Sequence, residues 1–225
     1  MPGMLYLVPT PIGNLGDISP RCRETLEQAD FIAAEDTRVS LKLLNYLGIK
    51  KSLISYYEHN KATKGNVIVE RILAGETCAL VSDAGSPAIS DPGEDLVKLC
   101  AQEGITVCAI PGPCAVITAI SISGQITGRF CFEGFLPTAK KSRRTHLDDL
   151  STETRTMVFY EAPHKLLATL EDMAEVLKDE CDIHIDWKRG LIDIDGIQVV
   201  EVEEGAEDDG TAEAERDAGQ SDDCQ

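Results

Sequence analysis

Short apolar runs alternate with longer amphipathic segments along the first half of the chain. The apolar runs are typical of buried strands, and the segments between them carry the spacing and end signals of helices. Strands are predicted over 5–8, 30–35, 78–81 and 105–110, and helices over 20–28, 40–47, 65–74, 94–103 and 114–122. This alternation predicts an α/β fold, with a mostly parallel sheet in the N-terminal domain and helices on its faces.

The character of the sequence shifts near Gly124, where we place a domain boundary. Beyond it, strands are predicted over 130–135 and 156–160, and helices over 140–150 and 164–177. We therefore expect an N-terminal α/β domain over 1–123 and a partial second α/β domain over 124–177.

The remaining segment differs in composition. Residues 178–225 carry 17 acidic and 4 basic side chains, whereas residues 1–177 carry 22 and 17, so most of the net charge of −18 lies in this segment. Its apolar residues predict two short strands about Asp195-Gly196, and its composition predicts disorder from about residue 203.

Several classes of protein are disfavoured. No apolar run approaches the roughly 20 residues that span a bilayer, and the N-terminus lacks a secretory signal. The 8 cysteines include no CxxC pair, which favours free thiols in the cytoplasm over a disulfide framework or a zinc site. The GxGxxG and P-loop motifs are absent, which argues against nicotinamide and nucleoside-triphosphate chemistry.

Four loops follow predicted strands, at 9–17, 35–38, 82–93 and 111–115. Because the carboxyl ends of parallel strands share one edge of a sheet, these loops are expected to meet there. The loop over 82–93 is rich in glycine, proline, serine and aspartate. That composition suits a ligand cradle, and it also suits an ordinary set of turns.

Six segments carry a resemblance to a known family. They occur in order over 8–17, 34–38, 82–93, 110–113, 132–137 and 160–165. Together they resemble the tetrapyrrole-methylase superfamily over about residues 4–177. Within it they are similar to the branch that methylates a cytidine ribose 2′-hydroxyl in bacterial 16S ribosomal RNA.

The resemblance implies a homodimer of two-domain subunits that bind S-adenosylmethionine between the domains and act on 16S ribosomal RNA or the small ribosomal subunit. Carried over by position, the cofactor-binding residues would be Pro11, Ile12, Asp83, Gly85, Ser86, Pro87, Ala88, Gly112, Cys114, Ala115, Phe135 and Tyr160. Turn formation is the alternative role for the prolines of these loops.

A ribose hydroxyl is a poor nucleophile at neutral pH, so a proton acceptor would assist the reaction. Glu35, Asp36 and His59 are the candidates. The two carboxylates have a structural alternative, which is to pair with Arg38 or to cap the next helix. His59 has the alternative of a plain exposed loop residue.

RNA binding requires cations for the phosphates. A compact basic stretch follows the motif at 132–137, and the expected RNA-binding residues are Arg38, Lys140, Lys141, Arg143 and Arg144. A solvated helix face is the alternative explanation for such a run.

The chain departs from the family after the predicted helix at 164–177. The family continues with further strands of the second domain, and nothing similar follows here, so the second domain is expected to be truncated. Two other functions remain open, the first because of the missing strands and the second because of the shared fold. One is a non-catalytic relative that binds cofactor or a partner, and the other is a methyltransferase for a small corrinoid-type molecule.

Overall fold

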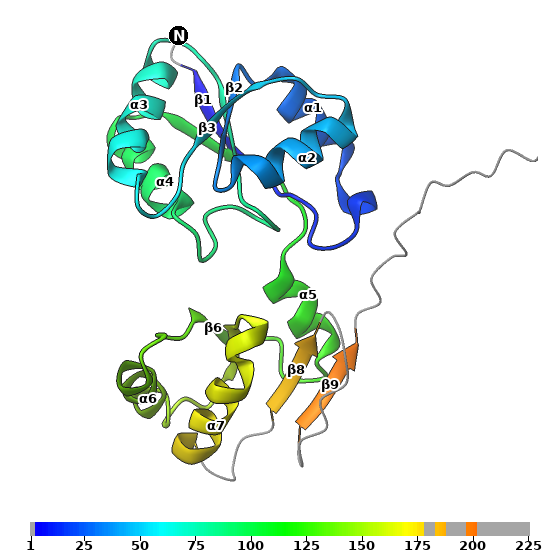
Figure 1. The fold of residues 1–225 in the computed structure, drawn as a ribbon, viewed down its shortest axis with the longest axis vertical. Helices are drawn as coiled ribbons and strands as arrows, with labels where there is room; N and C mark the ends of the chain where they lie inside the picture. Colours follow the sequence, from blue (N-terminus) through cyan, green and yellow to red (C-terminus); the bar gives the residue numbers. More distant parts are fainter. Residues whose placement is uncertain (1–2, 178–182, 188–196, 202–225) are drawn as a thin grey trace, which may run out of the picture.

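The computed structural model describes residues 3–177, 183–187 and 197–201. Its largest element is a five-stranded parallel sheet with strand order β3-β2-β4-β1-β5 (Figure 1). The strands are β1 (Met4–Leu7), β2 (Phe31–Ala34), β3 (Ser52–Ser55), β4 (Cys78–Val81) and β5 (Thr106–Ala109). The predicted parallel sheet is confirmed.

Helices cover both faces of this sheet, as the alternation predicts. They are α1 (Pro20–Gln28), α2 (Thr37–Leu47), α3 (Lys61–Leu73) and α4 (Gly93–Gln102), with a short 3-10 turn at Leu15–Asp17. Figure 1 shows α1 and α2 on one side of the sheet and α3 and α4 on the other. Helix α1 begins where Ser19 and Pro20 predict, because the Ser19 hydroxyl accepts a hydrogen bond from the Cys22 N–H at 3.1 Å.

The central strands β2 and β4 are apolar throughout because both of their faces are buried. In β2, Phe31 and Ala33 pack into the core beneath α3 and α4, whereas Ile32 and Ala34 pack into the core beneath α1 and α2. Strand β4 divides its side chains between the two cores in the same way. A strand with side chains in two cores is fixed in register, so the loops that leave its carboxyl end start from a rigid base.

Strand β3 was not predicted. It has only four residues, with a serine at each end, and it pairs with β2 alone as an edge strand of the sheet. A short, partly polar edge strand carries little apolar signal. Its presence matters because a fifth loop, residues 56–60, now leaves the same edge of the sheet as the four that were expected.

The chain continues from β5 through α5 (Ala115–Ile122) into a second, smaller α/β unit. This unit contains the parallel pair β6 (Phe130–Phe135) and β7 (Thr156–Tyr160), helices α6 (Lys140–Asp149) and α7 (Leu166–Leu177), and a 3-10 turn at Pro163–Lys165. The pairing shifts register between Phe132 and Gly134, and Gly134 has φ 63°. The domain boundary near Gly124 stays a prediction.

An ion-pair cluster joins α6 to α7. The Arg143 Nε and the Arg144 Nε donate to opposite oxygens of the Asp172 carboxylate at 2.8 and 2.7 Å. Arg143 and Asp172 are both buried, beside an apolar cluster that includes Leu147 and Leu170. Burial raises the pKa of Asp172, but the hydrogen bonds from Arg144 and Arg143 outweigh it and leave this pKa below its usual value.

Two further strands are described, β8 (Ile183–Trp187) and β9 (Ile197–Glu201), which pair in parallel with each other. Two short strands were predicted about Asp195-Gly196; the described strands pair in parallel, whereas two strands joined by a tight turn would pair antiparallel. The disorder predicted from about residue 203 lies outside the described residues. Six cysteines of the described part are free thiols, as expected. Within that part, no helix has the length and apolar character to cross a membrane.

Removing the Asp172 carboxylate tests the cluster between α6 and α7. Asp172→Ala leaves the buried Arg143 charge without its partner and is expected to destabilise the second unit by about 3 kcal/mol. Glu175→Ala removes an exposed partner of Arg144 and should cost less than about 1 kcal/mol. Hydrogen exchange of the α6 amides measures both effects, and equal losses in the two variants would contradict the assignment.

Candidate functional site

Two loops of the parallel sheet are joined by a backbone bridge. The Thr10 N–H donates to the Gly85 carbonyl and the Gly85 N–H donates to the Thr10 carbonyl, both at 3.0 Å. The Thr10 hydroxyl also donates to the Ser82 carbonyl at 3.1 Å. Gly85 has φ 86°, and a Cβ atom there would lie 3.3 Å from Ile12 Cγ2. Glycine is therefore required where the two loops meet.

The other two expected loops join the same edge. The Asp36 N–H donates to Asp83 Oδ1 at 3.0 Å, and the Ser86 hydroxyl donates to the Pro113 carbonyl at 2.9 Å. A Cβ atom on Gly112 would lie 2.7 Å from the Pro9 Cβ, so this loop packs directly against the first. The convergence of the four loops, predicted from the topology, is confirmed.

The loop after β4 contains two non-glycine residues with left-handed backbone, Ala88 at φ 66° and Ser90 at φ 60°. Asp91 fixes the backbone on both sides of Ser90. Its carboxylate accepts hydrogen bonds from the Ala88 N–H at 2.9 Å and from the Gly93 N–H at 2.7 Å. Strained backbone of this kind persists only where its surroundings fix it. Sequence reasoning did not identify Asp91, although an aspartate two residues before a glycine is a turn signal.

Two of the candidate proton acceptors lie in different electrostatic surroundings. Burial of Glu35 raises its pKa, and the nearby carboxylates of Asp83 and Asp91 raise it further. Asp36 caps α2 by accepting the Arg38 N–H at 2.8 Å, and its carboxylate also pairs with the Arg38 guanidinium. These bonds lower the pKa of Asp36 to about 2. Asp36 thus has the structural role that was its alternative, and it is a weak base.

The third candidate, His59, lies in the fifth loop. Its side chain is exposed, with its ring edge-on to Tyr57 at 6.1 Å between centroids. The loop is tied to the site by the Tyr56 hydroxyl, which donates to the Pro92 carbonyl at 3.1 Å. The sheet edge therefore carries His59 as well as Glu35.

The second unit reaches this edge through the carboxyl ends of its strands. A Cβ atom on Gly134 would lie 2.8 Å from the Ser90 hydroxyl, so β6 approaches that loop closely, and the φ of 63° at Gly134 favours glycine. The rings of Phe135 and Tyr160 lie 5.4 Å apart. Burial and the Cys114 thiol raise the pKa of Tyr160, and the Val116 N–H partly offsets this. Tyr160 is thus close to the start of α5, where Cys114 and Ala115 lie.

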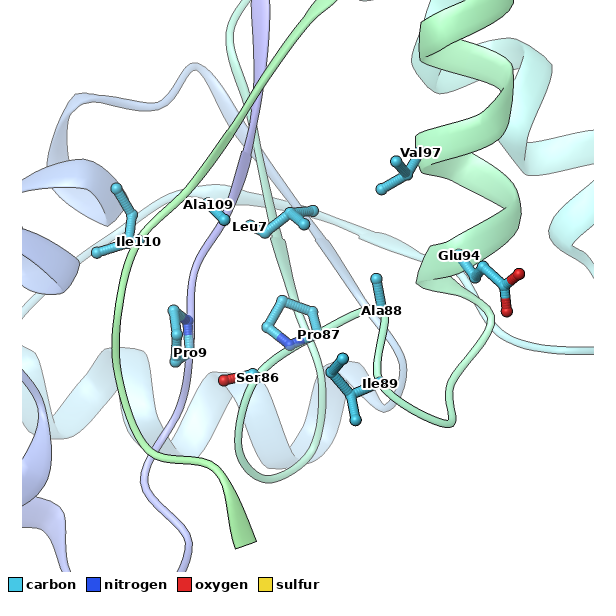
Figure 2. A pocket seen from close by; sticks show the side chains of 10 residues that line it. All are labelled: Leu7, Pro9, Ser86, Pro87, Ala88, Ile89, Glu94, Val97, Ala109 and Ile110. Atoms are coloured by element: carbon cyan, nitrogen blue, oxygen red, sulfur yellow. The ribbon is translucent and has the colours of Figure 1, made fainter. Parts of the chain in front are cut away.

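A hollow of about 370 Å³ lies beside α4 (Figure 2). Its lining is mostly apolar, with Pro9 and Pro87 from two loops and Val97 from α4 among its residues. A second hollow of about 300 Å³ lies beside α2, lined in part by Pro11 and Asp83. Of the expected cofactor residues, Ser86, Pro87 and Ala88 line the first hollow, whereas Pro11 and Asp83 line the second. Phe135 and Tyr160 line neither.

The expected RNA-binding residues have different surroundings. Arg38 is exposed, with 88% of its side-chain surface accessible, and Lys140 and Lys141 are exposed at the start of α6. Arg143 is only 7% exposed and its guanidinium is bonded to Asp172. Arg144 is bonded to Asp172 and Glu175. The basic stretch therefore divides into exposed lysines and arginines that hold the second unit together.

Sequence comparison places this chain among known proteins. A family model described as Tetrapyrrole (Corrin/Porphyrin) Methylases matches residues 4–187, past the end expected near residue 177. The ribosomal RNA small subunit methyltransferase I of Haemophilus influenzae is 52% identical over 178 residues, which are 79% of this chain and 63% of the relative. Its counterpart in Halalkalibacterium halodurans is 53% identical over 175 residues, or 78% and 61%. The chain spans about three fifths of the length of these relatives.

Solved structures share the fold. The uroporphyrin III C-methyl transferase of Thermus thermophilus superposes with a TM-score of 0.57 at 16% identity, over 79% of this chain and 78% of that one. A diphthine synthase superposes with a TM-score of 0.59 at 12% identity, over 77% and 71%. At such identities the likeness concerns architecture alone.

Removal of the Asp91 carboxylate tests its role in the loop. Asp91→Ala leaves the Ala88 and Gly93 N–H groups without their acceptor, at an expected cost of about 2 kcal/mol. Exchange of these two amides should then accelerate by roughly thirtyfold. Asp91→Asn keeps one acceptor oxygen and should show a smaller change. Unaltered exchange in Asp91→Ala would contradict the role.

Proposed function

This chain belongs to the tetrapyrrole (corrin/porphyrin) methylase family, and on that premise we propose that it transfers a methyl group from S-adenosylmethionine to a cytidine ribose 2′-hydroxyl of 16S ribosomal RNA. The observation that carries the proposal is the identity of about half of the aligned residues to proteins named ribosomal RNA small subunit methyltransferase I. The aligned length of 178 residues is long enough to include all the loops of the sheet edge.

The residues at this edge fit a sulfonium cofactor. Glu35, Asp83 and Asp91 are close enough for their charges to interact. Their carboxylates make the electrostatic potential at this edge negative, which favours a cation. The hollow beside α4 has the size and apolar lining of a small-molecule site. Gly85 and Gly112 allow backbone to approach closely where side chains would clash.

Bound S-adenosylmethionine would supply a methyl group on a positively charged sulfur. The chain contributes positioning, because the loops are fixed to one another by backbone and carboxylate hydrogen bonds. Holding the two reactants in line is the main source of acceleration for such a displacement. Pro11, Ile12, Gly85 and the 86–88 segment are proposed to orient the cofactor, with Gly112, Cys114, Ala115, Phe135 and Tyr160 completing its site.

Glu35 is the proposed proton acceptor. Its raised pKa makes it a better base than Asp36, whose carboxylate is occupied by Arg38. His59 lies farther along the edge, on an exposed loop, and is proposed as a second group that contacts RNA. Arg38, Lys140 and Lys141 are proposed to bind phosphates. Arg143 and Arg144 are left out of this surface because Arg143 is buried against Asp172 and Arg144 is bonded to Asp172 and Glu175.

The proposed substrate assigns the protein to the cytoplasm, where ribosomes assemble. A homodimer, which the family resemblance implies, is part of the proposal.

Transfer of labelled methyl groups tests the reaction. The chain is expected to label small ribosomal subunits that lack the modification, and to leave a corrinoid precursor unlabelled. Labelling of the corrinoid alone would identify a small-molecule methyltransferase. Binding of S-adenosylmethionine without transfer to either substrate would identify a non-catalytic relative.

A Glu35→Gln variant tests the proton acceptor. It should still bind S-adenosylmethionine, because Asp83 and Asp91 keep their charges, and it should lose most of kcat, on the order of 100-fold. In the unsubstituted chain kcat should rise with pH as Glu35 loses its proton, and the midpoint should lie above the usual glutamate value of 4.5 because its pKa is raised. Retention of this pH dependence in Glu35→Gln would contradict the assignment.

A further inference from the structure

The hollow beside α2 has a lining of mixed chemistry. Its walls come from the first loop, from the loop after β4 and from one face of α2. Helix α2 contributes Ser40, Lys42 and Tyr46, together with apolar side chains such as Val39. The cofactor proposal uses only Pro11 and Asp83 of this lining, so most of the hollow is without an assigned role.

Ser40 is the first sign that this hollow takes a ligand. It is only 3% exposed, and its hydroxyl is the one buried side-chain N or O atom in the described residues that has no hydrogen-bond partner. A buried hydroxyl without a partner is costly and calls for an explanation. A polar ligand in the hollow would provide the missing partner.

Three other side chains define the chemistry of that ligand. Tyr46 is 62% exposed, so its ring is available to stack on a base. Lys42 is exposed and forms no ion pair with any described residue, which leaves its ammonium available to a phosphate. Asp83 receives the Asp36 N–H on one oxygen and retains acceptor capacity that suits the exocyclic amine of cytosine.

The position of the hollow connects it with the sheet edge. Asp83 lines this hollow, and Ser86, three residues later, lines the hollow beside α4. Arg38, Lys42 and Tyr46 are spaced four residues apart, so they lie along one face of α2 and lead away from the edge. A single strand of RNA that follows this face of α2 would bring one nucleotide to the edge of the parallel sheet, beside Glu35.

We infer that the hollow beside α2 binds the nucleotide that accepts the methyl group, with Tyr46 stacked on a base, Lys42 on a phosphate and the Ser40 hydroxyl bonded within the hollow. This inference rests on the proposed function and names the substrate side of the same site. A second copy of the chain is the competing occupant, because Val39 and Leu41 are also exposed. The polar lining favours a nucleotide, and α2 carries two cations and no acid between Thr37 and Leu47.

The experiment compares single substitutions on α2 in the full chain, with a short oligocytidylate RNA as the probe. Tyr46→Ala should weaken RNA binding about tenfold through lost stacking. Lys42→Ala should weaken it and reduce its salt dependence by about one phosphate contact. Lys98→Ala, which removes an exposed lysine on α4, is the matched control and should leave the affinity unchanged.

Ser40→Ala separates a ligand contact from a structural role. Because it removes an unsatisfied buried hydroxyl, folding stability should stay the same or rise, while RNA affinity should fall several-fold. Reduced stability together with unchanged affinity would overturn the inference. So would the absence of any binding of the probe to the unsubstituted chain.

Two further measurements distinguish the remaining outcomes. Sedimentation should show the same oligomeric state for Tyr46→Ala and the unsubstituted chain. If the substitution dissociates a dimer and leaves RNA affinity unchanged, the hollow binds a second copy of the chain instead. Calorimetry with S-adenosylmethionine should give equal affinities for all the variants. If the unsubstituted chain fails to bind the cofactor, the proposed function fails, while loss of RNA affinity in the variants still supports the nucleotide site.

Discussion

The paired backbone hydrogen bonds between Thr10 and Gly85 are the contact on which the rest of the site depends. They fasten the loop after β1 to the loop after β4, beyond the end of the sheet itself. Asp83 and Ser86 flank Gly85, and each lines a different hollow. A larger residue in place of Gly85 would push against Ile12 and displace both hollows together.

The strained loop after β4 is where the five-stranded sheet approaches the β6–β7 pair. Asp91 accepts the N–H groups of Ala88 and Gly93, on either side of the left-handed Ser90, and a Cβ atom on Gly134 of β6 would lie 2.8 Å from the Ser90 hydroxyl. Gly134 itself lies at the register shift between β6 and β7. The two units therefore approach each other closely at a loop whose backbone is fixed by hydrogen bonds, and such rigidity suits catalysis by positioning.

The sequence predicted those helices and strands whose own residues mark where they begin or end. Helix α1 could be predicted because Ser19 and Pro20 mark its start, and β4 because its apolar run ends at a polar loop. Strand β3 could not be predicted, because its short run between two serines is a strand only through its pairing with β2. The convergence of the loops followed from parallel topology, but its division into two hollows depends on side chains of α2 and α4 that no motif reveals.

Charges were the least predictable part of the site. The sequence places Arg143 in a basic stretch, but its partner Asp172 lies 29 residues away on another helix. Asp36 likewise reads as a candidate base until its bonds to Arg38 are seen. Ser40 carries no signal in the sequence, because an unpaired hydroxyl is recognised only once its surroundings are known.

The central claim is that loops from separate strands form one ligand site at the edge of the parallel sheet. Hydrogen exchange with and without S-adenosylhomocysteine measures this directly. The account predicts that the ligand slows exchange in all four loops, at 9–17, 35–38, 82–93 and 111–115, and leaves α3 unchanged. Slowed exchange in a single loop, or in none, would contradict it.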